Sequence, residues 1–348
     1  MSFNLAILGL PHSGKSTVFK ALTQVSPANK GSEPNLAKVA VKDPRIDAMQ
    51  KFFNSPKVVP HYLTVLDFAP FAGLEAKPDR NELGGRFLAQ IKESDAILAV
   101  LKAFTGPDGE EPHPEKDAEA INLEMLLSDL KIVEGVLERK QKMARVAQKE
   151  AQQEVELLTR IKTALSQDQP IRDLELTPQE QAIIKNYSFL TQMPVIYLLN
   201  LGEGKKPEEF PLPQGISALP VYAQLEAELQ DLSPEDAALF AQELGLEQNF
   251  LPRIISEGFR VLNRITFFTS GEKEVHAWSV KAGSTALEAA GKIHTDLQRG
   301  FIRAEVIEWD KMLELGGCNK AKETGDLRLE GKDYKVKEGE VIVIRFNC

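Results

Sequence analysis

The chain has 348 residues, long enough for two or three domains, and its 43% hydrophobic and 27% charged residues are typical of a globular protein. A formal net charge of −9 excludes nucleic-acid binding through overall charge, so such binding would need a local basic patch. Two cysteines, Cys318 and Cys348, exclude a disulfide framework, and no apolar run reaches the about 20 residues that span a membrane. Without a signal-peptide pattern at its start, the sequence predicts a cytoplasmic protein that does not contact membranes.

The first predicted element is the buried strand Leu5–Leu8, which runs into a glycine loop and then a helical pattern from Thr17. The loop fits G-x-x-x-x-G-K-[ST], the P-loop pattern, in the strand–loop–helix context that the pattern requires. Its glycines let backbone N–H groups approach phosphate oxygens, which the helix N-terminus also attracts. Lys15 would neutralise the β- and γ-phosphates, and the Ser16 hydroxyl would complete a Mg²⁺ shell. The predicted nucleoside triphosphate site comprises Gly9, His12, Ser13, Gly14, Lys15, Ser16 and Thr17.

Further short apolar strands, separated by helical patterns, are predicted at Leu63–Leu66, Ile97–Leu101, Val195–Leu199 and Leu219–Tyr222. Near-continuous apolar strands of this kind are typical of a parallel sheet with helices on both faces, so the predicted fold class is α/β. Ligands of such sheets bind at the carboxyl ends of the strands, where the glycine loop lies. Asp67 ends one of these strands, and with a P-loop upstream we expect it on the Mg²⁺ side of the nucleotide.

Residues from about 117 to 190 break this rhythm with apolar residues spaced 3 or 4 apart, the pattern of one helix face. The residues of this pattern are Leu126, Leu130, Val133, Leu137, Leu158, Ile161 and Leu165. They predict two long antiparallel helices, a coiled-coil hairpin. Five basic residues lie at its turn, with no acid among them: Arg139, Lys140, Lys142, Arg145 and Lys149. Two interpretations stay open, a solvated helix face or a contact for RNA phosphates.

The stretch Asn200-Leu201-Gly202-Glu203 follows an apolar strand, where regular GTPases carry N-K-x-D. The aspartate of that motif accepts two hydrogen bonds from guanine and rejects adenine. The Asn200 amide offers a donor and an acceptor together, which suits adenine and favours ATP. Alternatively, Glu203 accepts from guanine on a longer arm, so that both ATP and GTP are used. The far side of the base is expected to be closed by Tyr222, Ala223 and Gln224.

A third unit is predicted from about residue 265. Polar and apolar residues alternate over 274–280 and 341–346, which predicts half-buried strands. A helix start follows the first of them, with Ser284 or Thr285 as its cap.

The segment after this helix carries the candidate contacts of the third unit. Arg299 and Arg303 are the candidates for phosphate contacts, and His294 is expected to be structural. Phe301 and Ile302 are expected in the core, because apolar residues usually serve packing.

The chain resembles the YchF/Obg-like ATPase family, on segments that run in order through nearly its whole length. They are GLPHSGKST, SEPN, KDPRID, AEAINLEMLLSDL, LELTPQEQ, TFFTSGEKEVHAW, GKIHTDLQRGFIRAEVI and GKDYKVKEGEVIVIRFN. The resemblance implies a Ras-like nucleotide domain interrupted by the coiled coil, a C-terminal β-grasp module called a TGS domain, and association with ribosomes. The implied boundaries are a nucleotide domain in two parts (1–116 and 191–264), the hairpin (117–190) and the TGS domain (265–348).

Several positions near the γ-phosphate depart from the family pattern. His12 stands where the family usually has an asparagine that is thought to help place a potassium ion. The switch threonine that caps Mg²⁺ falls on Gly31, which leaves Ser32 as the candidate metal ligand. In the D-x-x-G motif the sensing glycine is replaced by Pro70, which has no N–H, and Gly73 would have to serve instead.

The group that positions water for hydrolysis is also altered. Phe71 occupies the place of the usual glutamine, and relatives use a histidine from a loop, to which His113 corresponds here. Lys15 and His113 are therefore the candidate catalytic residues, although a lone loop histidine is more often only solvated.

The sequence therefore predicts a slow ATPase, possibly also using GTP, that couples nucleotide state to contact with a ribosome or structured RNA. The alternative is a nucleotide-gated ribosome- or RNA-binding module with little or no hydrolysis, which the residues Gly31 and Pro70 motivate. In both cases the expected cofactors are ATP or GTP and Mg²⁺, and the expected contacts are the hairpin turn and the TGS domain.

Overall fold

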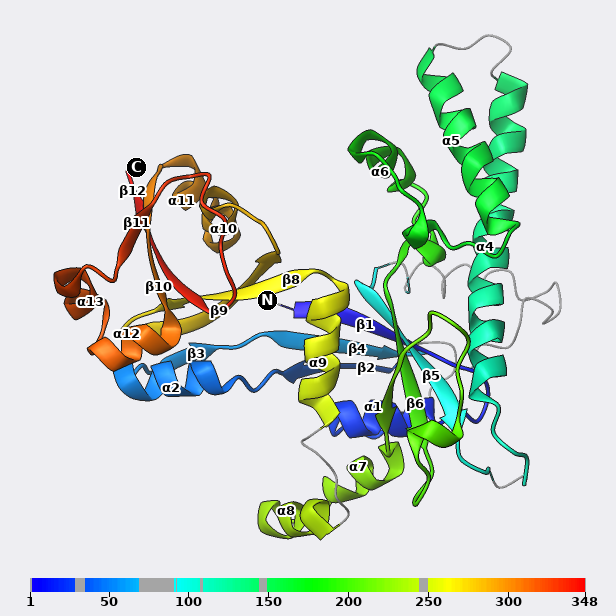
Figure 1. The fold of residues 1–348 in the computed structure, drawn as a ribbon, viewed down its shortest axis with the longest axis horizontal. Coiled ribbons are helices and arrows are strands. Elements are labelled where there is room, and N and C mark those ends of the chain that lie inside the picture. Colours follow the sequence, from blue (N-terminus) through cyan, green and yellow to red (C-terminus); the bar gives the residue numbers. More distant parts are fainter. Residues whose placement is uncertain are drawn as a thin grey trace. The chain divides into compact units, whose positions relative to one another are not determined.

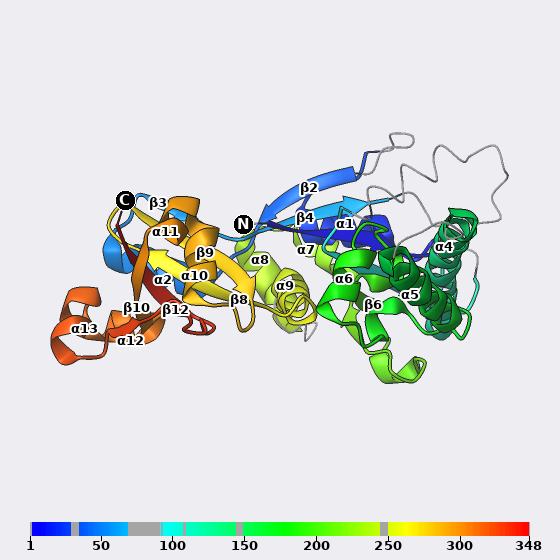
Figure 2. The same ribbon diagram turned by 90° about the horizontal axis from the view of Figure 1, so that it is seen from above.

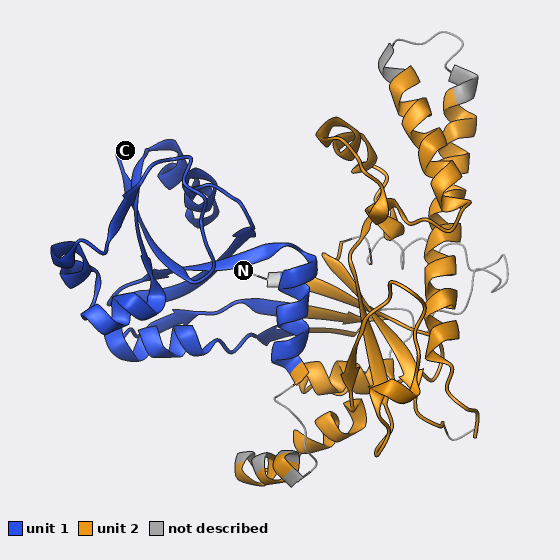
Figure 3. Ribbon diagram, viewed as in Figure 1, with its two compact units in different colours: residues 1–3, 38–63, 251–348 blue, residues 4–37, 64–250 orange. Residues whose placement is uncertain are grey.

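The computed structural model describes residues 2–28, 35–68, 91, 93–106, 109–143, 149–243 and 250–347. Figure 1 shows the chain as a ribbon, and Figure 3 divides it into two compact units. Unit 1 comprises residues 1–3, 38–63 and 251–348, and unit 2 comprises residues 4–37 and 64–250. No helix in the described part of the chain is long and apolar enough to cross a membrane.

The sheet that carries the glycine loop has six strands in the order β2-β4-β1-β5-β6-β7. Their bounds are β1 Ser2–Leu8, β2 Asn35–Ala40, β4 Tyr62–Asp67, β5 Ala96–Ala103, β6 Val195–Leu201 and β7 Ala218–Val221. The pairs β1–β5, β5–β6 and β6–β7 are parallel. The five predicted strands are therefore confirmed and the α/β fold class with them, whereas the edge strand β2 was not predicted.

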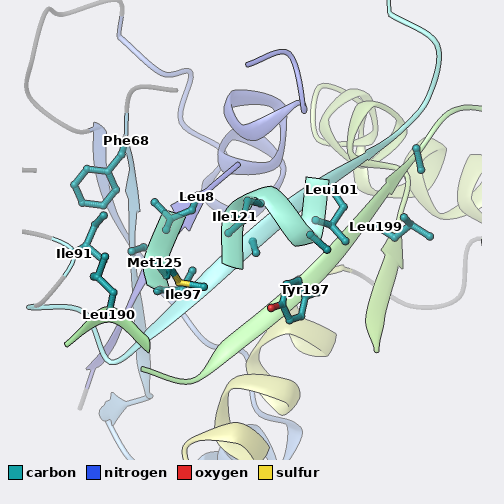
Figure 4. Packing of buried hydrophobic residues seen from close by; sticks show 14 of the residues in the cluster. Leu8, Phe68, Ile91, Ile97, Leu101, Ile121, Met125, Leu190, Tyr197 and Leu199 are labelled. Atoms are coloured by element: carbon teal, nitrogen blue, oxygen red, sulfur yellow. The ribbon is translucent and has the colours of Figure 1, made fainter. Parts of the chain in front are cut away.

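Strand β5 lies in the interior of this sheet, and its sequence AILAVLKA explains why. Every residue of it is buried except Lys102, so both faces of the strand are covered, as the near-continuous apolar run predicted. Figure 4 shows one of the two covered faces, where Ile121 and Met125 of a helix pack against Ile97 and Leu101 of β5.

That helix is α4, Pro114–Met143, and with α5, Lys149–Leu165, it forms the predicted hairpin. The two helices lie side by side in Figures 1 and 2. Six of the seven predicted seam residues are fully buried in one apolar cluster and Leu130 is partly buried, which confirms the coiled coil. The cluster also includes Ile184 of α6, Pro178–Ile184, and Phe189, so the base of the hairpin is packed as well as its seam.

Four further helices belong to unit 2 or extend from it into unit 1. The glycine loop leads into α1, Lys15–Thr23, and β7 leads into α7, Ala223–Leu229, and α8, Pro234–Glu243. The helix α9, Phe250–Val261, continues into unit 1.

The sheet of unit 1 has six strands in the order β11-β10-β12-β8-β9-β3. Their bounds are β3 Lys57–Val59, β8 Arg264–Ser270, β9 Glu274–Lys281, β10 Phe301–Glu308, β11 Arg328–Glu330 and β12 Glu340–Phe346. The helices of this unit are α2 Pro44–Phe53, α10 Ala286–Ile293, α11 Thr295–Arg299, α12 Trp309–Leu315 and α13 Cys318–Thr324. One apolar cluster joins α10 to the sheet, and another joins α2, α12 and α13 to it. The unit is therefore a sheet with helices on both faces.

The predicted start of α10 is confirmed, with Thr285 as the cap. Its side chain accepts a hydrogen bond from the Glu288 backbone N–H, and the Glu288 carboxylate accepts one from the Thr285 N–H in return, a capping box. The predicted strands differ in their burial. β9 alternates as expected, whereas β12 is buried continuously over 340–342 and then emerges into solvent.

Ile302 was expected in the core, and this prediction is wrong, since its exposed fraction is 55%. The cause is an irregularity in the pairing of β10 with β12. Phe301 pairs with Phe346 and Arg303 with Arg345, so Ile302 is an extra residue without a partner. A β-bulge of this kind re-aims a side chain, and only Phe301 keeps a partly buried place beside the core.

The compact units divide the chain differently from the predicted boundaries at 116, 190 and 264, because residues 38–63 belong to unit 1. Within this segment β3 pairs in parallel with β9, from Lys57↔Glu274 to Val59↔His276. Ile46 of α2 is buried in the same cluster as Phe268 of β8. The C-terminal sheet therefore includes a strand, β3, from the N-terminal part of the chain, and the helix α2 from the same part packs on it.

Candidate nucleotide site

The glycine loop between β1 and α1 has the backbone that only its glycines allow. Gly14, the residue before α1, has φ of 87°, in the left-handed region, and a Cβ on it would lie 2.2 Å from Nδ2 of Asn200. A Cβ on Gly9 would lie 2.8 Å from the Val100 carbonyl oxygen. Both motif glycines are therefore required for the close approach of the loop to β5 and β6.

Lys15 is folded back over this loop. Its Nζ donates hydrogen bonds to the carbonyl oxygens of Gly9 at 2.9 Å and Leu10 at 3.0 Å. The residue is only 6% exposed, and its burial lowers the pKa of the ammonium group to about 8, although the charge of Asp67 opposes the shift. Lys15 thus holds a partly desolvated positive charge at the mouth of the loop.

Asp67 lies at the end of β4, with 4% exposure, and its carboxylate is partly satisfied. Oδ2 accepts a hydrogen bond from Nδ2 of Asn35 at 3.2 Å, whereas Oδ1 has no hydrogen-bond partner among the described residues. Burial raises the pKa of Asp67, while Asn35, Lys15 and the Ser16 hydroxyl lower it. A buried carboxylate oxygen without a donor, beside a hydroxyl, is the donor set that Mg²⁺ prefers, so these two residues fit the metal.

Asn200 ties the loops of the site together. Its Nδ2 donates to the Ser13 carbonyl at 3.1 Å, and its Oδ1 accepts from the Ala223 backbone N–H at 3.3 Å. Asn200 therefore positions the glycine loop and the start of α7. One amide hydrogen and the second lone pair of its oxygen are left over, so the pairing of this amide with adenine stays a prediction.

Phe104 also lies at this site, and the sequence analysis did not single it out. Its ring lies 3.6 Å from where a Cβ of Gly14 would be, and its Cβ lies 3.0 Å from where one of Gly202 would be. The residue follows directly on β5 and so stands between the glycine loop and the Asn200–Glu203 stretch. A single phenylalanine after an apolar strand is not part of any sequence motif. Its position beside the glycine loop follows only from the pairing register of β5 with β6.

The remaining residues of the glycine loop differ in exposure. His12 is exposed and has φ of 61°, a left-handed conformation that histidine and asparagine adopt more readily than most residues. Ser13 is buried and its hydroxyl has no hydrogen-bond partner among the described residues, while Thr17 is half-buried on α1. Ser13 enters the site through its backbone carbonyl.

Of the residues expected around the base, some are bonded to Asn200 and others are not. Tyr222 precedes α7 and donates its hydroxyl to the Lys205 carbonyl at 2.6 Å, while Ala223 is bonded to Asn200. Gln224 donates to Glu228 along α7. Glu203 is exposed, and no hydrogen bond joins it to Asn200, Tyr222 or Ala223. The structure thus joins Ser13, Asn200 and Ala223 and leaves Glu203 apart.

His113 lies at the start of α4, where its carbonyl accepts from the Lys116 N–H and its ring Nδ1 lies 3.2 Å from Oε1 of Glu115. These contacts are local to the helix start, and none of them joins His113 to Lys15. The remaining predicted switch residues lie outside the described part of the chain: Gly31, Ser32, Pro70, Phe71 and Gly73.

The basic turn of the hairpin is described only in part. Arg139 is exposed and donates Nε to the Gly135 carbonyl, whereas Lys140 forms an ion pair with Glu154 at 2.5 Å. Arg145 lies outside the described residues, and only the backbone of Lys142 and Lys149 is described. Of the two residues in this set whose side chains are described, Lys140 is the one whose charge is compensated by an ion pair.

A parallel sheet whose first strand leads through a glycine loop into a helix, with Lys15 at its first residue, places the chain in the class of P-loop nucleotide-binding proteins. Residues 264–347 match the family model YchF-GTPase_C, which is described as "Protein of unknown function (DUF933)". A curated relative from Haemophilus ducreyi, named "Ribosome-binding ATPase YchF", is 41% identical over 365 aligned residues that cover all of both chains. A relative of the same name from Bacillus subtilis is 36% identical over 368 residues, again with full coverage of both.

A solved structure has the same fold over the whole chain. The "Structure of the Schizosaccharomyces pombe YchF GTPase" matches 99% of this chain and 97% of its own, with a TM-score of 0.80 and 28% identity. The chain belongs to the YchF family, which confirms the resemblance seen in the sequence.

Proposed function

We propose that this chain is a ribosome-binding ATPase with slow turnover. The observation that carries the proposal is the convergence of Lys15, Ser16 and Asp67 at the end of β1 and β4. The relatives named above are ribosome-binding ATPases by name, and they align with the chain from end to end.

In the proposed reaction the protein positions the triphosphate and compensates its charge. The Lys15 ammonium would leave the carbonyls of Gly9 and Leu10 for the phosphates, which offer a charged acceptor in place of two neutral ones. Asp67 and Ser16 would hold Mg²⁺, and the metal supplies charge neutralisation on the phosphates. Slow turnover follows from the altered switch positions, since Pro70 has no N–H for the γ-phosphate.

ATP is the proposed substrate, with GTP as the weaker one. The chain lacks the aspartate that selects guanine, and Glu203 is exposed rather than held by neighbouring donors. Phe104 would form one wall of the base site, a contact that any base accepts. Base selectivity would then be modest, because few fixed hydrogen-bond partners distinguish the two purines.

The test is phosphate release from ATP and from GTP, with Mg²⁺ and potassium, by the wild-type chain and by Lys15→Ala. Hydrolysis predicts release that disappears in the variant, and the faster of the two nucleotides identifies the substrate. Release equal to that of Lys15→Ala, together with ATP binding by calorimetry, would instead support the nucleotide-gated binder that Gly31 and Pro70 suggest.

The proposed ribosome contact, which places the protein in the cytoplasm, uses the hairpin turn and unit 1. Of the described basic residues at the turn, Arg139 is the better test, because Lys140→Glu would also break the ion pair with Glu154. Arg139→Glu should weaken co-sedimentation with ribosomes, while Lys131→Glu, an exposed lysine about 12 Å down the same helix, should not. Equal binding by both variants and the wild type would remove the turn from the proposed contact.

A further inference from the structure

Strand β5 extends past the point where β1 stops pairing with it. β1 pairs with β5 only as far as Leu8↔Ala99, whereas the pairing of β5 with β6 continues to Ala103. Backbone groups of β5 beyond Ala99 that do not face β6 need other partners. Lys102 donates its backbone N–H to Oδ2 of Asp117 at 2.9 Å, from the first turn of α4. Beyond the end of the pairing with β1, a side chain of α4 thus accepts a backbone hydrogen bond of β5.

Lys102, whose backbone N–H is bound by Asp117, is close to the parts of the site that would contact a base. Lys102 is the register partner of Asn200, and Phe104, two residues later, lies against Gly14 and Gly202. The Lys102 ammonium lies 5.8 Å from the centroid of the Phe104 ring. Any shift in the end of β5 would therefore change the distance between Phe104 and the glycine loop.

We propose that Asp117 is a positioning residue for the nucleotide base, which it serves by fixing the end of β5 and thereby the Phe104 ring. The inference rests on the nucleotide site proposed above and adds a residue on the hairpin helix that touches neither phosphate nor metal. Since α4 continues from Asp117 to the hairpin turn, the wall of the base site and the hairpin share one helix. The carboxylate is well suited to the task, because a charged acceptor binds a backbone N–H more strongly than a neutral one.

The test separates the base from the phosphates. Calorimetry measures the dissociation constants of ATP and of inorganic tripolyphosphate, which has no base, for Asp117→Ala, Asp117→Asn and the wild type. Asn122→Ala is the matched control, since its Oδ1 accepts a single hydrogen bond from the Tyr197 hydroxyl at 2.6 Å on the same helix. It removes one tie between α4 and the sheet without touching the end of β5.

Asp117→Ala should weaken ATP binding about tenfold, the size of the effect of one lost hydrogen bond to a charged acceptor, and change tripolyphosphate binding less than about twofold. Asp117→Asn should stay within about twofold for both, because its amide oxygen still accepts from Lys102. The control Asn122→Ala should also leave the affinity for both ligands within about twofold of the wild type. If Asp117→Ala does not fold, Asp117→Leu fills the space without an acceptor and carries the same expectation.

Two results would overturn the inference. Unchanged ATP affinity in Asp117→Ala would show that the end of β5 does not need the carboxylate. Equal weakening of ATP and tripolyphosphate would show a general loosening of the glycine loop. A wild-type chain that binds neither ligand would instead contradict the proposed nucleotide site itself.

Discussion

His61 gives unit 1 a stability that depends on pH, and the structure allows its size to be worked out. The imidazole is 4% exposed, its Nε2 lies 3.2 Å from the Thr266 hydroxyl oxygen, and its ring packs on Phe259 with 5.2 Å between centroids. Burial in this setting lowers the pKa of His61 to about 4, from 6.5 in an unfolded chain. The folded protein therefore keeps His61 neutral through mildly acidic pH, while the unfolded chain takes up a proton.

The sign and size of the effect follow from this difference in proton binding. Above pH 6.5 both states are neutral at His61 and the residue adds no pH dependence. Below it the unfolded state binds more protons, so the free energy of unfolding falls as the pH is lowered, by about 3 kcal/mol in total once the pH is below 4. Between pH 7 and pH 5 the expected loss is about 2 kcal/mol.

Urea unfolding followed by tryptophan fluorescence measures this loss, because both tryptophans, Trp278 and Trp309, belong to unit 1. His61→Gln is the comparison, since its amide can also bond to the Thr266 hydroxyl but does not titrate. His276, in the same unit, is present in both proteins, so the difference between their pH profiles removes its own titration and leaves that of His61 with its charge coupling to His276. A variant whose stability falls between pH 7 and pH 5 as much as that of the wild type would refute the reasoning.

Four other substitutions have defined expectations. Ser13→Ala removes a buried hydroxyl without a partner among the described residues and should raise unfolding stability by up to about 1 kcal/mol in a thermal-shift assay. Gly14→Ala forces a side chain into the left-handed region and against Asn200, so calorimetry should show at least about a tenfold loss of ATP affinity. Asp67→Asn should leave the melting temperature within a few degrees, while the Mg²⁺ concentration for half-maximal phosphate release rises about tenfold or more. Thr285→Ala removes the cap of α10 and should cost about 1 kcal/mol by urea unfolding of unit 1.

The parts of the fold that could be predicted from the sequence are those with local causes. The glycine loop is a contiguous motif, the strands of the parallel sheet are continuous apolar runs, and the hairpin seam has helical spacing over many turns. Each of these patterns is set by residues close in the chain, and each is confirmed. The cap at Thr285 is of the same kind, since its partner Glu288 lies only three residues away.

The parts that were missed depend on partners distant in the chain. Residues 38–63 carry an ordinary amphipathic helix and a three-residue strand, and nothing local shows that β3 pairs with β9 more than 200 residues later. The exposure of Ile302 depends on a bulge that exists only in the pairing with β12. Phe104 is identified by its contacts with Gly14 and Gly202, which come from two other loops. Tertiary register decides all three, and register cannot be predicted from composition or periodicity alone.

The helix α4 shows how a local pattern can be right and still incomplete. Its seam residues begin at Leu126, and the sequence analysis treated the insertion as a separate hairpin. The helix begins at Pro114, and its first turns pack on the sheet through Ile121 and Met125, with polar ties from Asp117 to β5 and from Asp129 to the backbone of residues 190 and 191. A partner that bound at the hairpin turn would therefore act on a helix that is held to the sheet through the half-buried Asp117 and to the short turn Leu190–Gln192 through the buried Asp129. If such binding shifts α4, it shifts the end of β5, and by linkage ATP must then change the affinity for the partner by the same factor as the partner changes the affinity for ATP.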